Sequence, residues 1–265
     1  MTGSITTAVA PTQPVTTGRD GIPFGRLLRT ELRKLTDTRA SRWFLAAIIA
    51  ATPIVVVVML FAVAPKDLTY NKFVDYTVAP EKILLPALGI LAMTSEWSQR
   101  TGLVTFTLVP DRRRVLLAKF MATLALGLLV IAIVFAVSAV GNLLGIGLRH
   151  GNGSWSFGLA GFAEITLVQL IGLVQGMAFG MAMLITAAAI VSYYVVPNLW
   201  SVLFSSTSSL KHSANWVDLN QAAGNLYNQK ITGTGWLQLL VAAALWILIP
   251  LTVGVWRVSR TEVKT

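Results

Sequence analysis

The residues best able to do chemistry lie in one polar stretch, Thr94 to Phe120, which reads TSEWSQRTGLVTFTLVPDRRRVLLAKF. It places a glutamate, Glu96, and five basic residues between two long apolar segments. Pro110 should end a short, weakly apolar element, and Asp111 is well placed to cap the next helix. Arg112 to Arg114 then suit the lipid head-group boundary. The pattern predicts either a docking element for a cytoplasmic partner or a solvated loop whose arginines only fix topology.

Other chemistries lack the residues that they need. The chain has no cysteine, which excludes a disulfide framework, a thiolate metal site and a cysteine nucleophile. It has no phosphate-binding Gly-rich loop and no His-Glu-x-x-His zinc motif, and both histidines, His150 and His212, fall in expected loops. Glu164 is the one ionisable residue that qualifies as a buried group within a span, and head-group depth is a simpler interpretation for it than a proton relay. We therefore expect no catalytic residue, no metal site and no enzyme activity in this chain.

Composition places the protein in a membrane. Apolar residues make up 55% of the chain and charged residues only 12%, and the mean hydropathy is +0.69. A net charge of +10 would suggest a nucleic-acid partner for a soluble protein. In an integral membrane protein the distribution of basic residues matters more than their sum, so we expect no nucleic-acid partner.

Six apolar segments can position the polar stretch, since a span needs about 20 apolar residues to cross a core of about 30 Å. We expect spans near residues 43–63, 80–97, 115–147, 160–183, 185–206 and 236–256. The third is longer than a bilayer requires, so either its first turns stand in water or it bends near Gly141 and Gly145. The stretch 160–206 is too long for one helix, and we place a turn near Thr186. The predicted fold class is all-α, with six transmembrane helices.

An amphipathic helix should precede the first span. Residues 1–22 are rich in Thr, Pro and Gly and predict a disordered tail. Residues 23–41 combine a Leu/Phe stripe at helical spacing with a basic stripe, which favours an interface helix along the membrane surface over an ordinary solvated helix. The residues that we expect to define it are Arg26, Arg29, Leu32 and Arg33. The transmembrane domain is then 42–258, and residues 259–265 form a C-terminal tail.

Orientation follows from lysine and arginine. In a six-span topology, fifteen of the 21 basic residues fall on the side of the two termini and the polar stretch. By the positive-inside rule that side is cytoplasmic. If residues 160–206 were a single span, the basic C-terminus would lie outside, so the split into two spans has independent support.

The fourth span is built for close helix packing. Gly172, Gly176 and Gly180 recur at i, i+4 and i+8 on one face, which lets a neighbouring backbone approach. Gln169 and Gln175 in the same span can hydrogen-bond across a helix interface or line a polar path, and we expect the former.

A family resemblance bears on the polar stretch. Its ordered set Glu96, Gly102, Pro110, Arg113 and Lys119 has five, seven, two and five residues between successive members. This resembles the signature E...GT...L..P..R..ilaaK of permease subunits of ATP-binding cassette (ABC) transporters, type 2 exporter family. The order here is Thr101-Gly102 instead of Gly-Thr. TAAAIV at 186–191 and the ending VGVWRVSRTEVK are also similar to the family, so the resemblance covers nearly the whole chain.

The resemblance implies a mechanism. The loop between spans two and three would hold a coupling helix that docks on a separate ATPase subunit, which binds ATP and Mg, so this chain itself holds no cofactor. The implied ATPase-coupling residues are Glu96, Thr101, Gly102, Phe106, Pro110, Arg113 and Lys119. Short extracytoplasmic helices between spans five and six, in residues 207–235, would gate the exit.

The expected function is therefore the multi-pass permease of an ATP-driven exporter in the cell membrane, moving a drug, lipid, peptide or glycan. Its partners would be the ABC ATPase, a second permease copy or a homologous permease, and membrane lipids. The alternative is a standalone channel or secondary carrier.

Overall fold

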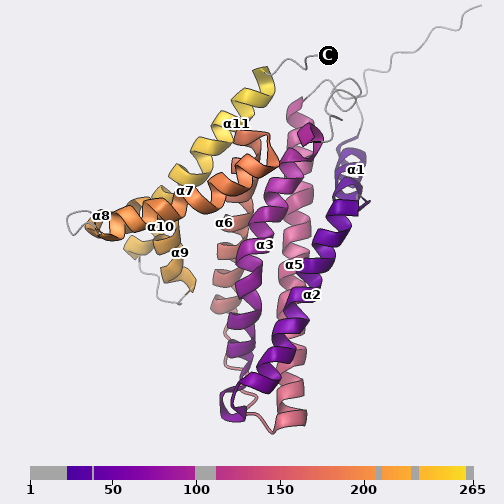
Figure 1. The fold of residues 1–265 in the computed structure, drawn as a ribbon, viewed down its shortest axis with the longest axis vertical. Helices are drawn as coiled ribbons and strands as arrows, with labels where there is room; N and C mark the ends of the chain where they lie inside the picture. The colour runs from indigo at the N-terminus through magenta and orange to yellow at the C-terminus, as the bar shows by residue number, and fades with distance from the viewer. Residues whose placement is uncertain (1–22, 38, 99–111, 207–210, 228–232, 261–265) are drawn as a thin grey trace, which may run out of the picture.

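The computed structural model describes residues 23–37, 39–98, 112–206, 211–227 and 233–260, and every regular element within these ranges is helical. Six of the helical segments are long and apolar enough to cross a membrane. They are α2 (Arg39–Ala62), α3 (Tyr70–Ser98), α5 (Arg112–Arg149), α6 (Leu159–Met183), α7 (Thr186–Ser206) and the continuous run from α10 (Gly233–Ala243) to α11 (Ile249–Arg260). This confirms an all-α, multi-pass membrane protein with six spans (Figure 1).

The end of α3, the start of α5, α1 (Phe24–Asp37) and the end of α11 lie at the same end of the molecule (Figure 1). Hydrogen bonds there also join the start of α7 to α3, since the Thr186 hydroxyl lies 2.8 Å from that of Thr94. Arg257 of α11 donates to the carbonyl oxygen of Ala182 at the end of α6. Any two of these helix ends are therefore separated along the chain by an even number of spans or by none.

The predicted turn between spans four and five lies close to where it was expected. α6 ends at Met183, and Leu184 adopts a left-handed conformation with φ 59° before α7 begins at Thr186. The third span, α5, runs unbroken from Arg112 to Arg149. Gly141 in this helix lets the side chains of Val56 and Phe73 approach, with an added Cβ only 2.9 Å from each.

The second span is longer than predicted. α3 begins at Tyr70, not near residue 80, so Asp75 and Glu81 lie within a membrane-spanning helix. The expectation that Glu164 alone qualifies as a buried ionisable group there was wrong. Charges and two prolines interrupt the apolar run of α3, but much of the helix is buried against other helices and need not be apolar on every face.

Backbones approach most closely between α3 and α6. A Cβ added at Gly176 would lie 2.2 Å from the carbonyl oxygen of Pro86, and one at Gly180 would lie 3.1 Å from that of Ile90. Gly89 on α3 faces α6 in the same way, with Leu173 O at 2.5 Å. Gly172 is less tightly enclosed, with its nearest neighbour at 3.4 Å. Glycine is thus required on both helices at this contact.

Two short helices, α8 (Lys211–Val217) and α9 (Leu219–Tyr227), follow α7. Asp218 separates them, and its Oδ1 accepts hydrogen bonds from the backbone amides of Asn220 at 2.9 Å and Gln221 at 3.4 Å, so it caps α9. Leu219 and Leu226 of α9 are buried in one core with Phe179 of α6 and Trp246. The short helices therefore pack against the sides of α6 and the last span, near the middle of the long axis in Figure 1.

The last span changes its winding where it meets α8. Residues Ala244–Leu248 form a π-helical turn between α10 and α11, just before Pro250, which has no backbone N–H to donate. Trp246 lies in this turn, and its indole Nε1 donates to the carbonyl oxygen of Val217 at 2.8 Å. The wider turn thus places a tryptophan that holds the end of α8.

Candidate functional site

Four charged side chains form a buried cluster at the end of the molecule where α1, α3 and α5 meet. Lys34 Nζ lies 2.7 Å from Glu31 Oε1 and 2.9 Å from Glu96 Oε1. Lys119 Nζ lies 3.4 Å from Glu31 Oε2 and 3.3 Å from Glu96 Oε1. We call these four residues the charge cluster. Its two carboxylates and two ammonium groups are formally balanced, which is how ionised groups are accommodated when they are buried.

Burial differs among the four members. The side chains of Glu31, Glu96 and Lys119 are 2%, 8% and 4% exposed, whereas that of Lys34 is 40% exposed. Burial disfavours the charged form of Lys34, but its hydrogen bond to Glu31 and the charge of Glu96 outweigh that effect, so the pKa of Lys34 is raised above its usual 10.5. Lys34 is thus held in its charged form at the rim of the cluster.

The local sequence explains why Glu31 is buried. Leu27, Glu31 and Leu35 are spaced i, i+4 and i+8, so the glutamate lies on the apolar stripe of α1, and all three are buried. Leu27 packs with Val115 and Ala118 of α5, while Leu35 joins a core shared with α2, α3 and α5. The contacts of the apolar stripe are therefore with protein.

The predicted interface-helix residues lie around this stripe. Arg26, Arg29 and Arg33 are exposed, and Leu32 is partly buried against the core that contains Leu35. The basic stripe thus faces outward while the leucines hold α1 on the protein. Glu31 and Lys34 were missed as site residues, although an acidic residue on an apolar stripe was a readable signal.

The predicted coupling residues fall into two groups. Glu96 and Lys119 are brought together in the charge cluster, and Arg113 is exposed one turn and a half before Lys119 on α5. Thr101, Gly102, Phe106 and Pro110 lie outside the described residues. The segment 99–111 that contains them is bracketed by Glu96 and Lys119, so the cluster closes the base of this loop and ties it to α1.

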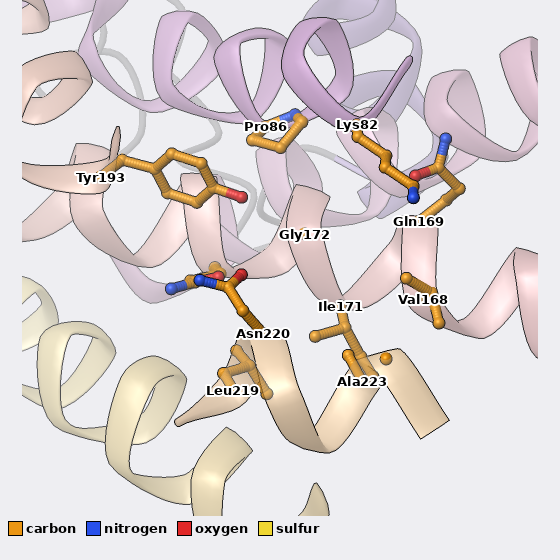
Figure 2. Close-up of a pocket in the computed structure, with 12 residues that line it drawn as sticks. Lys82, Pro86, Val168, Gln169, Ile171, Gly172, Tyr193, Leu219, Asn220 and Ala223 are labelled. Atoms are coloured by element: carbon orange, nitrogen blue, oxygen red, sulfur yellow. The ribbon is translucent and has the colours of Figure 1, made fainter. Parts of the chain in front are cut away.

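A second site is a cavity of about 170 Å³ between α3, α6, α7 and α9 (Figure 2). We call it the central cavity. Five polar side chains line it: Lys82 of α3, Gln169 and Gln175 of α6, Tyr193 of α7 and Asn220 of α9. Gln169 and Gln175 both line this cavity, so they border a polar space, and a hydrogen bond from either amide across a helix interface stays a prediction.

Glu81 is the third notable group. Its side chain is fully buried, and its Oε1 accepts one hydrogen bond, from the Thr52 hydroxyl of α2 at 3.3 Å. Its Oε2 has no hydrogen-bond partner within the described ranges. Glu164 lies in the second turn of α6, and its Oε2 also has no hydrogen-bond partner among the described residues. A buried carboxyl in a spanning helix is costly and is therefore a candidate for function.

No group of three or more His, Asp or Glu that could hold a metal ion occurs in the part of the chain that the structure describes. Comparisons of the chain with family models, with curated proteins and with solved structures gave no match.

Proposed function

We propose that this chain is the membrane-spanning permease subunit of an ATP-driven ABC exporter. It acts as a dimer, with a second copy or a homologous permease, and with ATPase subunits from other chains that bind ATP and Mg. The termini and the 99–111 loop lie on the cytoplasmic side of the cell membrane. Hydrolysis takes place in the partner, so the permease itself is not an enzyme.

The observation that supports this proposal best is the charge cluster at the base of the loop. An element that transmits force from a partner to the spans needs a stiff connection, and ion pairs among buried side chains provide one. Lys119 contacts both Glu31 of α1 and Glu96 of α3, so displacement of the loop is passed to α1, α3 and α5 together. A loop that serves only topology has no need of such a connection.

The experiment that tests the proposal is purification of the tagged full chain from its native membrane in a mild detergent. An ATPase subunit should copurify, and the complex should hydrolyse ATP. Recovery of the permease alone, at a detergent concentration that preserves its own fold, would contradict the assignment.

One observation favours the alternative, a secondary carrier. Proton-coupled carriers use buried ionisable groups within their spans, and Glu81 is such a group, with no charged residue hydrogen-bonded to it among the described residues. An ATP-driven permease does not require this carboxyl for energy coupling, so substitution of Glu81 separates the two functions.

A further inference from the structure

The central cavity has the properties of a built binding site. Its polar groups come from four helices that are far apart in the sequence, and they converge on one space (Figure 2). The side chains of Gln169 and Gln175 are 4% and 6% exposed, so both are more than nine-tenths buried. Both amides line the cavity. Buried amides normally have hydrogen-bond partners, and buried polar side chains that converge on one cavity are typical of a ligand-binding site.

The polar lining is dominated by donors. The ammonium of Lys82, three carboxamide NH₂ groups and the Tyr193 hydroxyl offer more donor hydrogens than the lining offers acceptor oxygens. No carboxylate lines the cavity. The charge of Lys82 interacts with that of Asp75, two turns earlier on α3, but Asp75 is not a lining residue. A ligand group rich in acceptor oxygens and negatively charged fits this lining, and a cationic group does not.

The remaining wall is apolar. It is formed by Pro86, Val168, Ile171, Leu219 and Ala223, together with Gly172 and Gly224. Figure 2 shows Leu219 and Ala223 on α9, facing α6 across the cavity. A space of about 170 Å³ accommodates a compact head group but not an alkyl chain as well. The chain of such a ligand would therefore extend beyond the cavity.

We propose that the central cavity binds the anionic head group of an amphiphilic substrate, such as a phosphate monoester of a long-chain alcohol. Lys82 pairs with the charge, and Gln169, Gln175 and Tyr193 donate hydrogen bonds to its oxygens. The role of this ligand as a transported substrate rests on the proposed export function. The binding itself is a property of this chain alone, so it is measured without an ATPase.

The test is titration of dodecyl phosphate into the full chain, delipidated and purified in a non-ionic maltoside detergent, with binding measured by equilibrium dialysis. Dodecyltrimethylammonium, with the same chain and the opposite charge, is the comparison ligand. The variants are Lys82→Met and Gln169→Leu. The matched controls are Lys72→Met, exposed on the first turn of α3, and Gln238→Leu on α10, neither of which lines the cavity.

Saturable binding of dodecyl phosphate, at least about tenfold tighter than that of dodecyltrimethylammonium, is expected. Lys82→Met and Gln169→Leu should each weaken it about tenfold, as expected for a hydrogen bond to a charged group, while the controls stay unchanged. Asn220→Ala changes an exposed residue of α9 and tests the site even if a buried variant fails to fold; it should weaken binding about threefold.

Three outcomes would overturn the proposal. The two ligands could bind with equal affinity, or the cavity variants could bind dodecyl phosphate as tightly as the control variants do. Binding could also fail to saturate, which would indicate that the cavity holds only water. An anionic lipid of the native membrane that copurifies with the wild type, is lost from both cavity variants and resists exchange with dodecyl phosphate would indicate a resident lipid and would overturn the substrate assignment. Failure of ATPase copurification would leave this binding result untouched and would affect only the export function.

Discussion

Glu96 on α3 and Lys119 on α5 lie 3.3 Å apart between Oε1 and Nζ, although the 99–111 loop separates their helices in the sequence. Each also forms an ion pair with a residue of α1: Glu96 with Lys34, and Lys119 with Glu31. Lys34 pairs with Glu31 as well. These ion pairs therefore join α1 to the end of α3 and to the start of α5.

Removing one cation from the charge cluster should destabilise the protein. Lys119→Met leaves two buried carboxylates with only Lys34 between them, and breaking a buried ion pair on one side costs about 3 kcal/mol or more. The measurement is thermal unfolding in detergent. Arg33→Met, on the exposed basic stripe of α1 and outside the charge cluster, is the control and should change little. Addition of Glu31→Gln to Lys119→Met should recover part of the loss; additive losses would contradict a coupled cluster.

The α3–α6 contact should tolerate no side chain at Gly176. Gly176→Ala places a Cβ 2.2 Å from the Pro86 carbonyl oxygen, and because the obstacle is backbone, the helices must separate, at a cost of about 2 kcal/mol or more. Gly147→Ala is the matched control, since nothing lies within 4 Å of its added Cβ. That change should be neutral or stabilising by up to about 1 kcal/mol. Equal melting temperatures for the two variants would show that the close contact is absent.

Glu81→Gln distinguishes the two candidate functions. The amide is nearly isosteric and uncharged, so it relieves the burial of a carboxyl whose Oε2 is unpaired, and thermal stability should be maintained or raised. An ATP-driven permease should retain transport in inside-out vesicles supplied with ATP. Loss of transport by this variant, together with dependence of the wild type on a proton gradient and not on ATP, would establish the carrier instead.

The cysteine-free chain makes the orientation of the spans directly measurable. Single cysteines at Gly3, Arg113 and Lys264 should be protected from an impermeant thiol reagent in intact cells, because the basic side is cytoplasmic. A cysteine at Ser213, exposed on α8, should react. Labelling at Lys264 alone would contradict an even number of spans.

The six spans were predictable, because a membrane-spanning helix depends on a long apolar run. A turn within residues 160–206 was predictable, since it keeps the basic C-terminus on the side of the N-terminus, and the break at Leu184 lies close to the expected position near Thr186. The first part of α3 was not found, because Asp75 and Glu81 interrupt its apolar run, and Glu81 is accommodated by burial beside Thr52 of α2. A hydropathy argument counts apolar residues and does not detect a helix shielded by its neighbours.

The candidate sites were predictable only in part. Glu96 and Lys119 were named from the family resemblance, whereas their partner Glu31 was missed although it lies on the apolar stripe of α1. The central cavity is lined by both α3 and α9, which are far apart along the chain. No local sequence pattern therefore indicates that Asn220 and Lys82 line the same space. Gln169 and Gln175 were noted, yet which polar groups they face is decided by tertiary packing.

The most direct test of the central claim is pull-down of the copurifying ATPase with purified loop variants, alongside ATP-dependent transport in vesicles. Neither Phe106 nor Arg113, which is exposed in the first turn of α5, belongs to the charge cluster, so both variants should insert and dimerise normally. Both should lower ATPase association and transport together, about tenfold each if they are central contacts. The loss in Arg113→Glu should depend on salt concentration, whereas the loss in Phe106→Ala should not. Normal association and normal transport for both variants would contradict the coupling assignment and leave the secondary carrier as the better account.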